Sequence, residues 1–192
     1  MGGLRNRRRI YDTRYFESGL HSHGKREEIV MAVDAFLKLA GIDGESTDDK
    51  HKGWIELLSH SFGMSQPASA ASATGGRTTE RVNISDFSIT KVEDKASPYL
   101  ALACCDGRHI KDVKVELCEA SQDKHKYVEF VLEDVIISSF QISGSSGGDK
   151  PAENITFNFG KIKWEYTPLG HDGKAGTKVG PLGWNLELNK KI

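Results

Sequence analysis

The apolar positions along most of the chain recur every second residue. This alternation marks residues 33–39, 113–117, 128–132 and 184–188, where charged or amide side chains separate the apolar ones. A period of two places successive side chains on opposite faces of a β-strand. Each segment is therefore predicted to be a strand with one buried and one wetter face. The pattern predicts an all-β protein.

Two segments shift the phase of this alternation partway along. In residues 155–166 the apolar set skips one position near Gly160, and in residues 82–89 it skips one between Ile84 and Phe87. One extra residue that reverses the facing is typical of a β-bulge, which bends a strand. Bent strands let a sheet curl, so the predicted architecture is a two-sheet β-barrel.

One short α-helix interrupts the strands. Ser97 is a favoured N-cap, Pro98 suits the first helical position and Gly107 suits the C-terminal cap. Residues 99–105 between them contain no β-branched side chain and have high helix propensity. The predicted fold class is thus all-β with one short α-helix.

The balance of charges limits the kinds of partner. The 192 residues include 26 Lys and Arg against 27 Asp and Glu, a net charge of −1. A nucleic-acid binder normally carries a basic face, so no nucleic-acid partner is expected. No apolar stretch approaches the about 18–20 residues that a membrane helix needs, so no membrane insertion is expected.

The three cysteines predict neither a disulfide framework nor a zinc site. The number of cysteines is odd, and no two of them form a C-x-x-C pair: they are Cys104, Cys105 and Cys118. Unpaired cysteines are usually buried, so free buried thiols are expected, and a reducing compartment suits them.

Residues 1–30 differ from the rest of the chain. Seven Lys and Arg against four Asp and Glu give this segment a charge of +3, and no apolar core of a secretory signal follows its arginines. It is predicted to be a disordered basic extension, with a single domain over residues 31–192. Lys25-Arg26-Glu27-Glu28 has purine-rich codons shortly before Met31. Translation is therefore predicted to begin at Met31, and the intact mass of the natively expressed protein tests this.

The chain's motifs give no support for catalysis. Residues 144–148 match G-x-S-x-G around Ser146, but a strand follows where a nucleophile elbow needs a helix. The acidic run 43–49 lacks the Gly and Glu of a calcium-binding EF-hand, which predicts a solvated turn. The seven histidines show no metal-binding spacing. No catalytic residue, metal site or cofactor is expected.

Several segments in order resemble the Hcp (haemolysin-coregulated protein) family. They are residues 31–51, Ile55–Ser59, Phe62–Gln66, the helix from Ser97 to Cys104, Glu153–Phe159 and the ending Gly183-Trp184-Asn185. No single segment is specific, but their order and spacing together are. The resemblance runs from Met31 to the C-terminus, which agrees with the predicted start.

The resemblance implies the tube protein of the type VI secretion system. Such proteins form hexameric rings that stack into a tube beneath a spike protein, inside a contractile sheath on a baseplate. They carry small effector cargo in the lumen. They are exported from the bacterial cytoplasm to the extracellular space or a target cell, without a signal peptide. A structural protein rather than an enzyme is expected.

The resemblance also assigns residues to surfaces. Ser61 is expected to contact cargo in the lumen, with Ser59 on the same face. The long loop 66–79 has no apolar period and is predicted to be either mobile or ordered only against a partner. By resemblance it reaches the adjoining ring, through Gln66, Pro67, Ser69, Ser72, Thr74 and Arg77. His60 stands where relatives often have an aromatic residue, which predicts pH-sensitive cargo binding or assembly.

Two alternatives from other classes remain. The first is a monomeric β-barrel that binds a small molecule, which requires an apolar cavity and no self-association. The second is a hydrolase using Ser146, in which Ser146→Ala abolishes an activity.

Overall fold

The computed structural model describes residues 33–67, 81–120, 124–148, 150–170 and 174–192. All of them belong to one compact unit, Met31–Ile192. The predicted extension over residues 1–30 lies outside the described residues. The elements in chain order are β1 (Val33–Leu39), β2 (Ile55–Leu57), β3 (Ser59–Ser61), β4 (Met64–Ser65), β5 (Asn83–Ile84), β6 (Phe87–Val92), α1 (Ser97–Asp106), β7 (Ile110–Glu119), β8 (Lys126–Ser143), β9 (Ala152–Tyr166), β10 (Val179–Asn185) and β11 (Lys190–Lys191).

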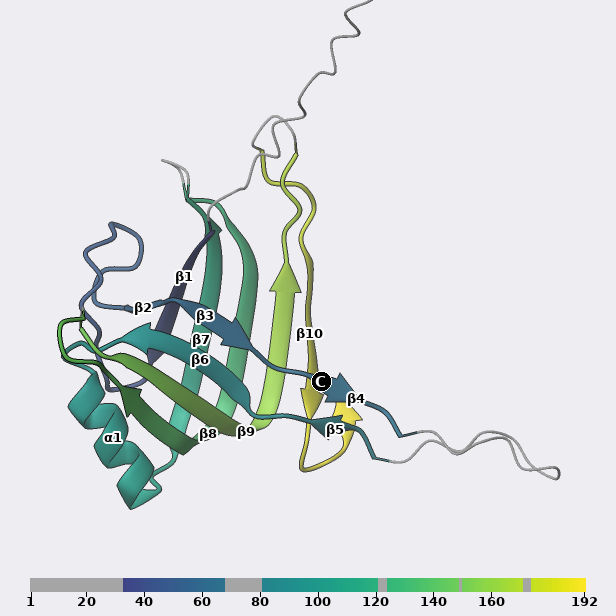
Figure 1. Cartoon of the computed structure of the whole chain (residues 1–192). Coiled ribbons are helices and arrows are strands. Elements are labelled where there is room, and N and C mark those ends of the chain that lie inside the picture. The colour runs from purple at the N-terminus through teal and green to yellow at the C-terminus, as the bar shows by residue number, and fades with distance from the viewer. Residues whose placement is uncertain (1–32, 68–80, 121–123, 149, 171–173) are drawn as a thin grey trace, which may run out of the picture. The chain divides into compact units, whose positions relative to one another are not determined.

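The strands form one curled antiparallel sheet and a small two-stranded sheet (Figure 1). The main sheet has the order β11-β10-β9-β8-β7-β1-β2, and β6 joins it by pairing with both β9 and β3. Residues 55–61 connect two parts of this sheet, because β2 pairs with β1 and β3 pairs with β6. The predicted β class is confirmed, although the sheets do not close into a complete barrel.

The two long strands β8 and β9 carry the sheet from one layer into the other (Figure 1). The first half of β9 pairs with β6 and the second half with β10, and the change of partner falls near Gly160. The bulge predicted there is wrong in position, because the β8–β9 register shifts between Ile137 and Ser139 instead. Because β9 passes from one layer to the other near Gly160, the core lies on opposite sides of the strand before and after this point. The buried positions therefore change phase without an extra residue.

The predicted bulge in residues 82–89 is a break between two strands. β5 pairs with β4 in the small sheet, whereas β6 pairs in the main sheet. The predicted strand 184–188 also ends early, at Asn185. The reason is local, because the Asn185 side chain accepts a hydrogen bond from the Leu188 backbone N–H at 2.8 Å and holds a turn.

The helix is confirmed, but its N-terminus differs from the prediction. The N-cap is Ala96, and Ser97 is the first helical residue. The Ser97 hydroxyl instead accepts a hydrogen bond from Lys91 Nζ at 3.0 Å. Gly107 ends the helix in the left-handed conformation with φ 62°, as expected for a glycine cap. Among the described residues, α1 included, no helix is long and apolar enough to span a membrane.

Side chains from both layers and from α1 fill the interior of the curled sheet. Phe87, Phe157 and Leu132 are fully buried there, with Leu100 from α1. This filled interior disfavours the alternative of a barrel that encloses a small molecule. The interior also contains an ion pair, since Lys91 Nζ lies 2.6 Å from Glu153 Oε2 and both side chains are fully buried.

The expectation of free, buried thiols is confirmed only in part. All three are free thiols, and Cys118 is buried. Cys105, however, is exposed and Cys104 is half-buried. Adjacent residues on a short surface helix point in directions about 100° apart, so both cannot face the core.

Candidate functional site

Ser59 and Ser61 lie on β3 with exposed side chains. They are two residues apart on a strand, so they share one face, and the half-buried His60 between them faces the other way. The structure thus places both predicted residues together on a solvent-facing surface.

This surface continues across four neighbouring strands. Ser59 lies opposite Thr90 and Ser61 opposite Ser88 on β6. The same rows extend to β9 and β8. We define the polar face as the outward-facing residues of these rows: Ser59, Ser61, Ser88, Thr90, Ser139, Gln141, Asn154 and Thr156. Each of them is uncharged and bears a hydroxyl or amide group.

One carboxylate lies at the border of the polar face and is held by its neighbours. Asp86 Oδ2 accepts a hydrogen bond from Ser138 Oγ at 2.5 Å, and Oδ1 accepts one from Asn158 Nδ2 at 2.8 Å. Ser138 Oγ also lies 2.8 Å from Thr156 Oγ1 on the polar face itself. Short side chains that bond one another make a shallow surface, which offers many hydrogen-bonding groups and little net charge.

His60 is part of an aromatic cluster on the inner side of β3. Its ring stacks against Phe87 at 6.1 Å between ring centroids and contacts Phe130 at 6.0 Å. Phe62 completes the cluster. Burial lowers the pKa of His60 below its usual 6.5. The ring faces away from the polar face, so any pH sensitivity is expected to act through packing rather than through direct contact with cargo.

His60→Phe is expected to reduce the loss of stability on mild acidification. A folded-state pKa below the unfolded value means that the unfolded chain binds more protons, so His60 weakens folding as pH falls below about 6.5. Thermal melts of the wild type and the variant from pH 8 to pH 5.5 measure this. The melting temperature of the wild type should fall more steeply, and parallel curves would contradict the assignment.

Only part of the predicted stacking loop lies in the described residues. Gln66 and Pro67 are exposed and follow β4, whose pairing with β5 brings the two ends of the segment 66–82 side by side. Ser69, Ser72, Thr74 and Arg77 lie outside the described residues, so their role stays a prediction.

The opposite layer carries a strongly charged surface. We define the charged face as the charged outward residues of β7, β8 and β9 in that layer: Asp112, Lys114, Glu116, Glu129, Glu133, Lys161, Lys163 and Glu165. Lysines pair with the carboxylates across the strands, as Lys163 and Lys161 do with Glu133. The hydrogen bond from Lys163 is the main reason that the pKa of Glu133 is lowered. The two layers therefore present chemically different surfaces.

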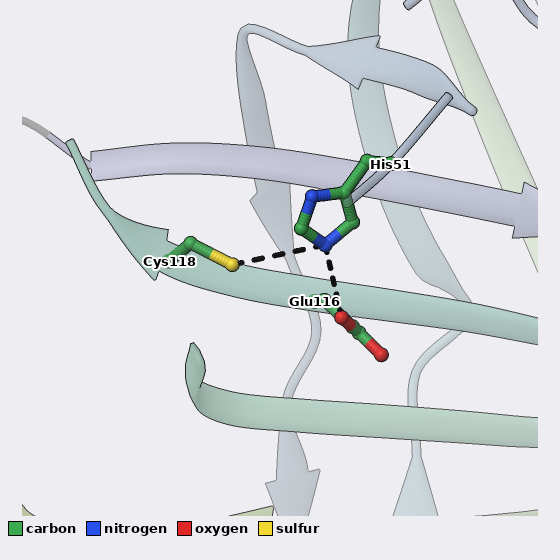
Figure 2. A group of neighbouring side chains, drawn as sticks. All are labelled: His51, Glu116 and Cys118. Atoms are coloured by element: carbon green, nitrogen blue, oxygen red, sulfur yellow. Dashed lines mark hydrogen bonds and ion pairs between the residues drawn. The ribbon is translucent and has the colours of Figure 1, made fainter. Parts of the chain in front are cut away.

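A loop between β1 and β2 folds over the edge of the charged face and buries His51. Its ring stacks on Phe36 at 4.1 Å and meets the edge of Trp54 at 5.0 Å between centroids. His51 Nε2 lies 3.0 Å from Glu116 Oε2 and 3.9 Å from Cys118 Sγ, both on β7 (Figure 2). The structure thus brings together three potential metal ligands.

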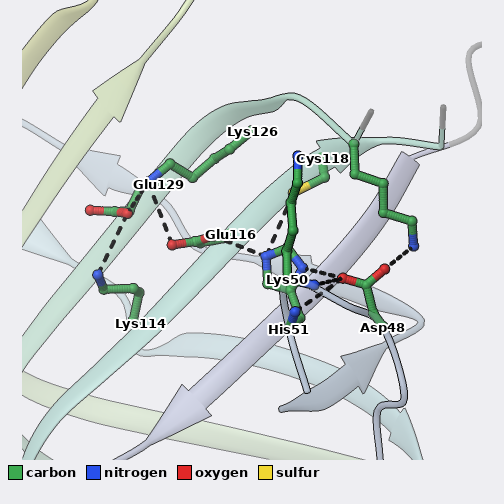
Figure 3. Close-up of polar contacts among 9 residues, drawn as sticks. Asp48, Lys50, His51, Lys114, Glu116, Cys118, Lys126 and Glu129 are labelled. Carbon is green, nitrogen blue, oxygen red and sulfur yellow. Dashed lines mark hydrogen bonds and ion pairs between the residues drawn. The ribbon is translucent and has the colours of Figure 1, made fainter. Parts of the chain in front are cut away.

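The other ring nitrogen faces a second carboxylate. His51 Nδ1 lies 2.8 Å from Asp48 Oδ1, which also accepts a hydrogen bond from the His51 backbone N–H (Figure 3). Lys124 forms ion pairs with Asp48 Oδ2 at 2.7 Å and with Asp34 Oδ2 at 2.8 Å. The Lys124 hydrogen bond is the main reason that the pKa of Asp48 is lowered to about 2. The prediction of a merely solvated turn at residues 43–49 is wrong for Asp48.

Sequence reasoning missed this cluster for a definable reason. His51 and Glu116 are 65 residues apart, and only the pairing of β1 with β7 brings their surroundings together. The available signals were local: Glu116 and Cys118 share one strand face, and Asp48 precedes His51 by three residues.

The G-x-S-x-G motif lies in a turn between two strands, as predicted. Ser146 is exposed in the turn between β8 and β9, and Gly147 supplies a positive φ of 85°. A strand follows this turn, so the strand–turn–helix geometry of a nucleophile elbow is not formed.

The fold and its surfaces define a small β-domain whose candidate functional residues lie on the faces of its sheet. A family model described as Type VI secretion system effector, Hcp, matches residues 36–166. Protein hcp1 of Pseudomonas aeruginosa is 37% identical over 160 residues, which cover 83% of this chain and 98% of that protein. The chain belongs to the Hcp family of the type VI secretion system.

Solved structures agree with this assignment. A structure described as a type six secretion system protein superposes with a TM-score of 0.80 at 41% identity, covering 84% of this chain and 100% of that one. Hcp1 from Salmonella typhimurium superposes with a TM-score of 0.68 at 31% identity, again covering 84% of this chain and all of that one. The similarity therefore extends across nearly the whole length of each relative.

Proposed function

We propose that this chain is a tube subunit of a type VI secretion system, with a structural rather than catalytic role. Six copies form a ring, rings stack into a tube, and the tube leaves the bacterial cytoplasm with effector cargo in its lumen. Membership of the Hcp family supports the assignment to this secretion system, and the chemistry of the polar face supports its placement on the wall of the lumen.

The uncharged polar face is the observation that carries the proposal. A tube that holds and then releases different proteins needs a wall without strong fixed charges, because a charged wall retains partners of opposite sign and repels those of like sign. Hydroxyl and amide groups bind cargo through individually weak hydrogen bonds. Ser59 and Ser61 lie at the edge strand of this face, where we place the cargo contact.

Exposed apolar side chains supply candidate ring contacts. On α1, Tyr99 and Leu102 are 59% and 57% exposed, and Leu58 beside β3 is 64% exposed. Large apolar side chains that gather on a surface favour protein–protein contact. A head-to-tail contact through such surfaces closes into a ring when its rotation divides a full turn evenly.

Contacts between rings and with the rest of the machine complete the proposal. The loop of Gln66, Pro67, Ser69, Ser72, Thr74 and Arg77 reaches the adjoining ring. The spike protein caps the tube, and the contractile sheath and baseplate surround it. Secretion through this system supplies the export route, so no signal peptide is needed.

Gold labelling in electron microscopy tests which layer faces the lumen. A Cys104→Ser/Cys105→Ser background removes the exposed helix thiol, and Ser61→Cys then provides a labelling position on the polar face. Lys114→Cys, on the charged face, is the matched control. Maleimide-gold on Ser61→Cys is expected at the centre of ring class averages, and gold on Lys114→Cys at the rim.

The reverse distribution of gold, or rings with both labels at the rim, would refute the lumen assignment while leaving ring formation intact. Particles without any ring would refute the tube assignment itself. The two parts of the proposal therefore fail in distinguishable ways.

A further inference from the structure

The environment of His51 contains more hydrogen-bond acceptors than a neutral imidazole can satisfy. A neutral imidazole carries one N–H, yet carboxylate oxygens face both ring nitrogens, at 2.8 Å from Asp48 and 3.0 Å from Glu116. One of the two contacts therefore needs a second proton, on the ring or on a carboxyl group, or a metal ion between its atoms.

The arrangement of donors on the Nε2 side matches metal coordination. Imidazole nitrogen, carboxylate oxygen and thiol sulfur all lie within 4.8 Å of one another. Glu116 and Cys118 project from the same side of β7 towards His51 (Figure 2). Nitrogen, oxygen and sulfur together are the donor set that Zn²⁺ accepts, and three protein ligands leave one tetrahedral position for water.

The surroundings hold His51 in the orientation that a ligand needs. Asp48 binds Nδ1 and leaves Nε2 free to coordinate. Zinc-bound histidines are commonly oriented by a carboxylate in this position. Phe36 and Trp54 fix the plane of the ring and form an apolar wall. His51 is only 3% exposed and Cys118 is fully buried, so few water molecules compete for the donors.

Two neighbouring lysines bind carboxylates of the cluster but leave the oxygen that faces His51 Nε2. Lys124 bridges Asp34 and Asp48, and Lys126 pairs with Glu129. Lys126 Nζ lies 3.5 Å from Glu116 Oε1, whereas Oε2 is the oxygen that faces His51. One oxygen of Glu116 thus remains directed into the cluster.

We propose that His51, Glu116 and Cys118 form a binding site for a divalent zinc-type metal ion, with Asp48 as the orienting carboxylate. The bound ion fastens the loop before β2 onto β7. Coordination replaces the Cys118 thiol proton, which passes to solvent. Metal binding therefore releases a proton and weakens at acidic pH.

Cobalt substitution of the untagged full chain tests the site. Metal is first removed with chelator, and Co²⁺ is then titrated. One equivalent is expected to give the near-ultraviolet thiolate-to-cobalt band and visible bands of tetrahedral intensity. Zn²⁺ should displace the cobalt and raise the melting temperature by about 5–10 °C at a hundredfold excess over its dissociation constant.

Variants assign the ligands. Cys118→Ser is expected to abolish the thiolate band, and Glu116→Gln to lower affinity at least tenfold while keeping the band. Cys104→Ser/Cys105→Ser is the matched control and should bind as the wild type does. Circular dichroism in chelator shows that each variant is folded. A wild type that binds no cobalt, or a thiolate band that survives Cys118→Ser, would overturn the proposal.

Discussion

Lys91→Met is expected to lower the free energy of unfolding by about 3–5 kcal/mol, because it leaves a carboxylate buried without its partner. Lys91 and Glu153 lie directly opposite each other on β6 and β9, and both are fully buried. Glu153 Oε2 binds Lys91 Nζ at 2.6 Å, and Oε1 has no hydrogen-bond partner among the described residues. Glu153 therefore depends on Lys91 for its charge compensation.

Urea unfolding followed by circular dichroism measures this loss. The double variant Lys91→Met/Glu153→Leu is the control, since replacing a buried pair with apolar side chains of similar volume is often neutral or stabilising. Asp94, 2.8 Å from Lys91 Nζ, loses its ion pair in both variants, but its side chain is not fully buried. It should recover most of the stability that the single variant loses. A single variant within about 1 kcal/mol of the wild type would show that the pair contributes little.

Gly44→Ala is expected to cost about 3 kcal/mol, because the new methyl group has no space. A Cβ at this position would lie 2.3 Å from the Trp54 carbonyl oxygen and 2.6 Å from Ile55 Cα. Both are backbone atoms, so the two sides of the loop must separate. The Gly44 backbone N–H also donates to the Gly53 carbonyl at 2.8 Å, a bond that such a separation weakens.

Gly63→Ala is the matched control for this steric effect. Its added Cβ would meet only Ser85 Oγ, at an ordinary distance of 3.8 Å, so a change within about 0.5 kcal/mol is expected. Both variants are compared in the same urea experiment. Equal losses from Gly44→Ala and Gly63→Ala would contradict the close packing of the loop that contains His51.

Alternation predicted the strands because each layer of the sheet buries one face. Residues 33–39 form β1 with the predicted bounds, and Gly107 ends the helix as expected. The failures occur where tertiary contacts override the local pattern. Ser97 is used by the buried Lys91 rather than as a cap, and Asn185 ends β10 by bonding Leu188.

The candidate surfaces were predictable to different degrees. The shared face of Ser59 and Ser61 follows from a period of two on one strand, so the sequence suffices for it. The polar face as a whole depends on the registers of β3, β6, β9 and β8, which the sequence does not specify. The His51 cluster depends on how a loop folds over β1 and β7, a long-range contact that the local pairs Asp48/His51 and Glu116/Cys118 do not specify.

The mass of the protein in solution tests the central claim most directly. Size exclusion coupled to light scattering should be run on the full chain and on residues 31–192, over a range of concentrations. The account predicts a species of six chains for both. A monomer for both at every concentration would contradict the tube assignment and favour a solitary β-domain.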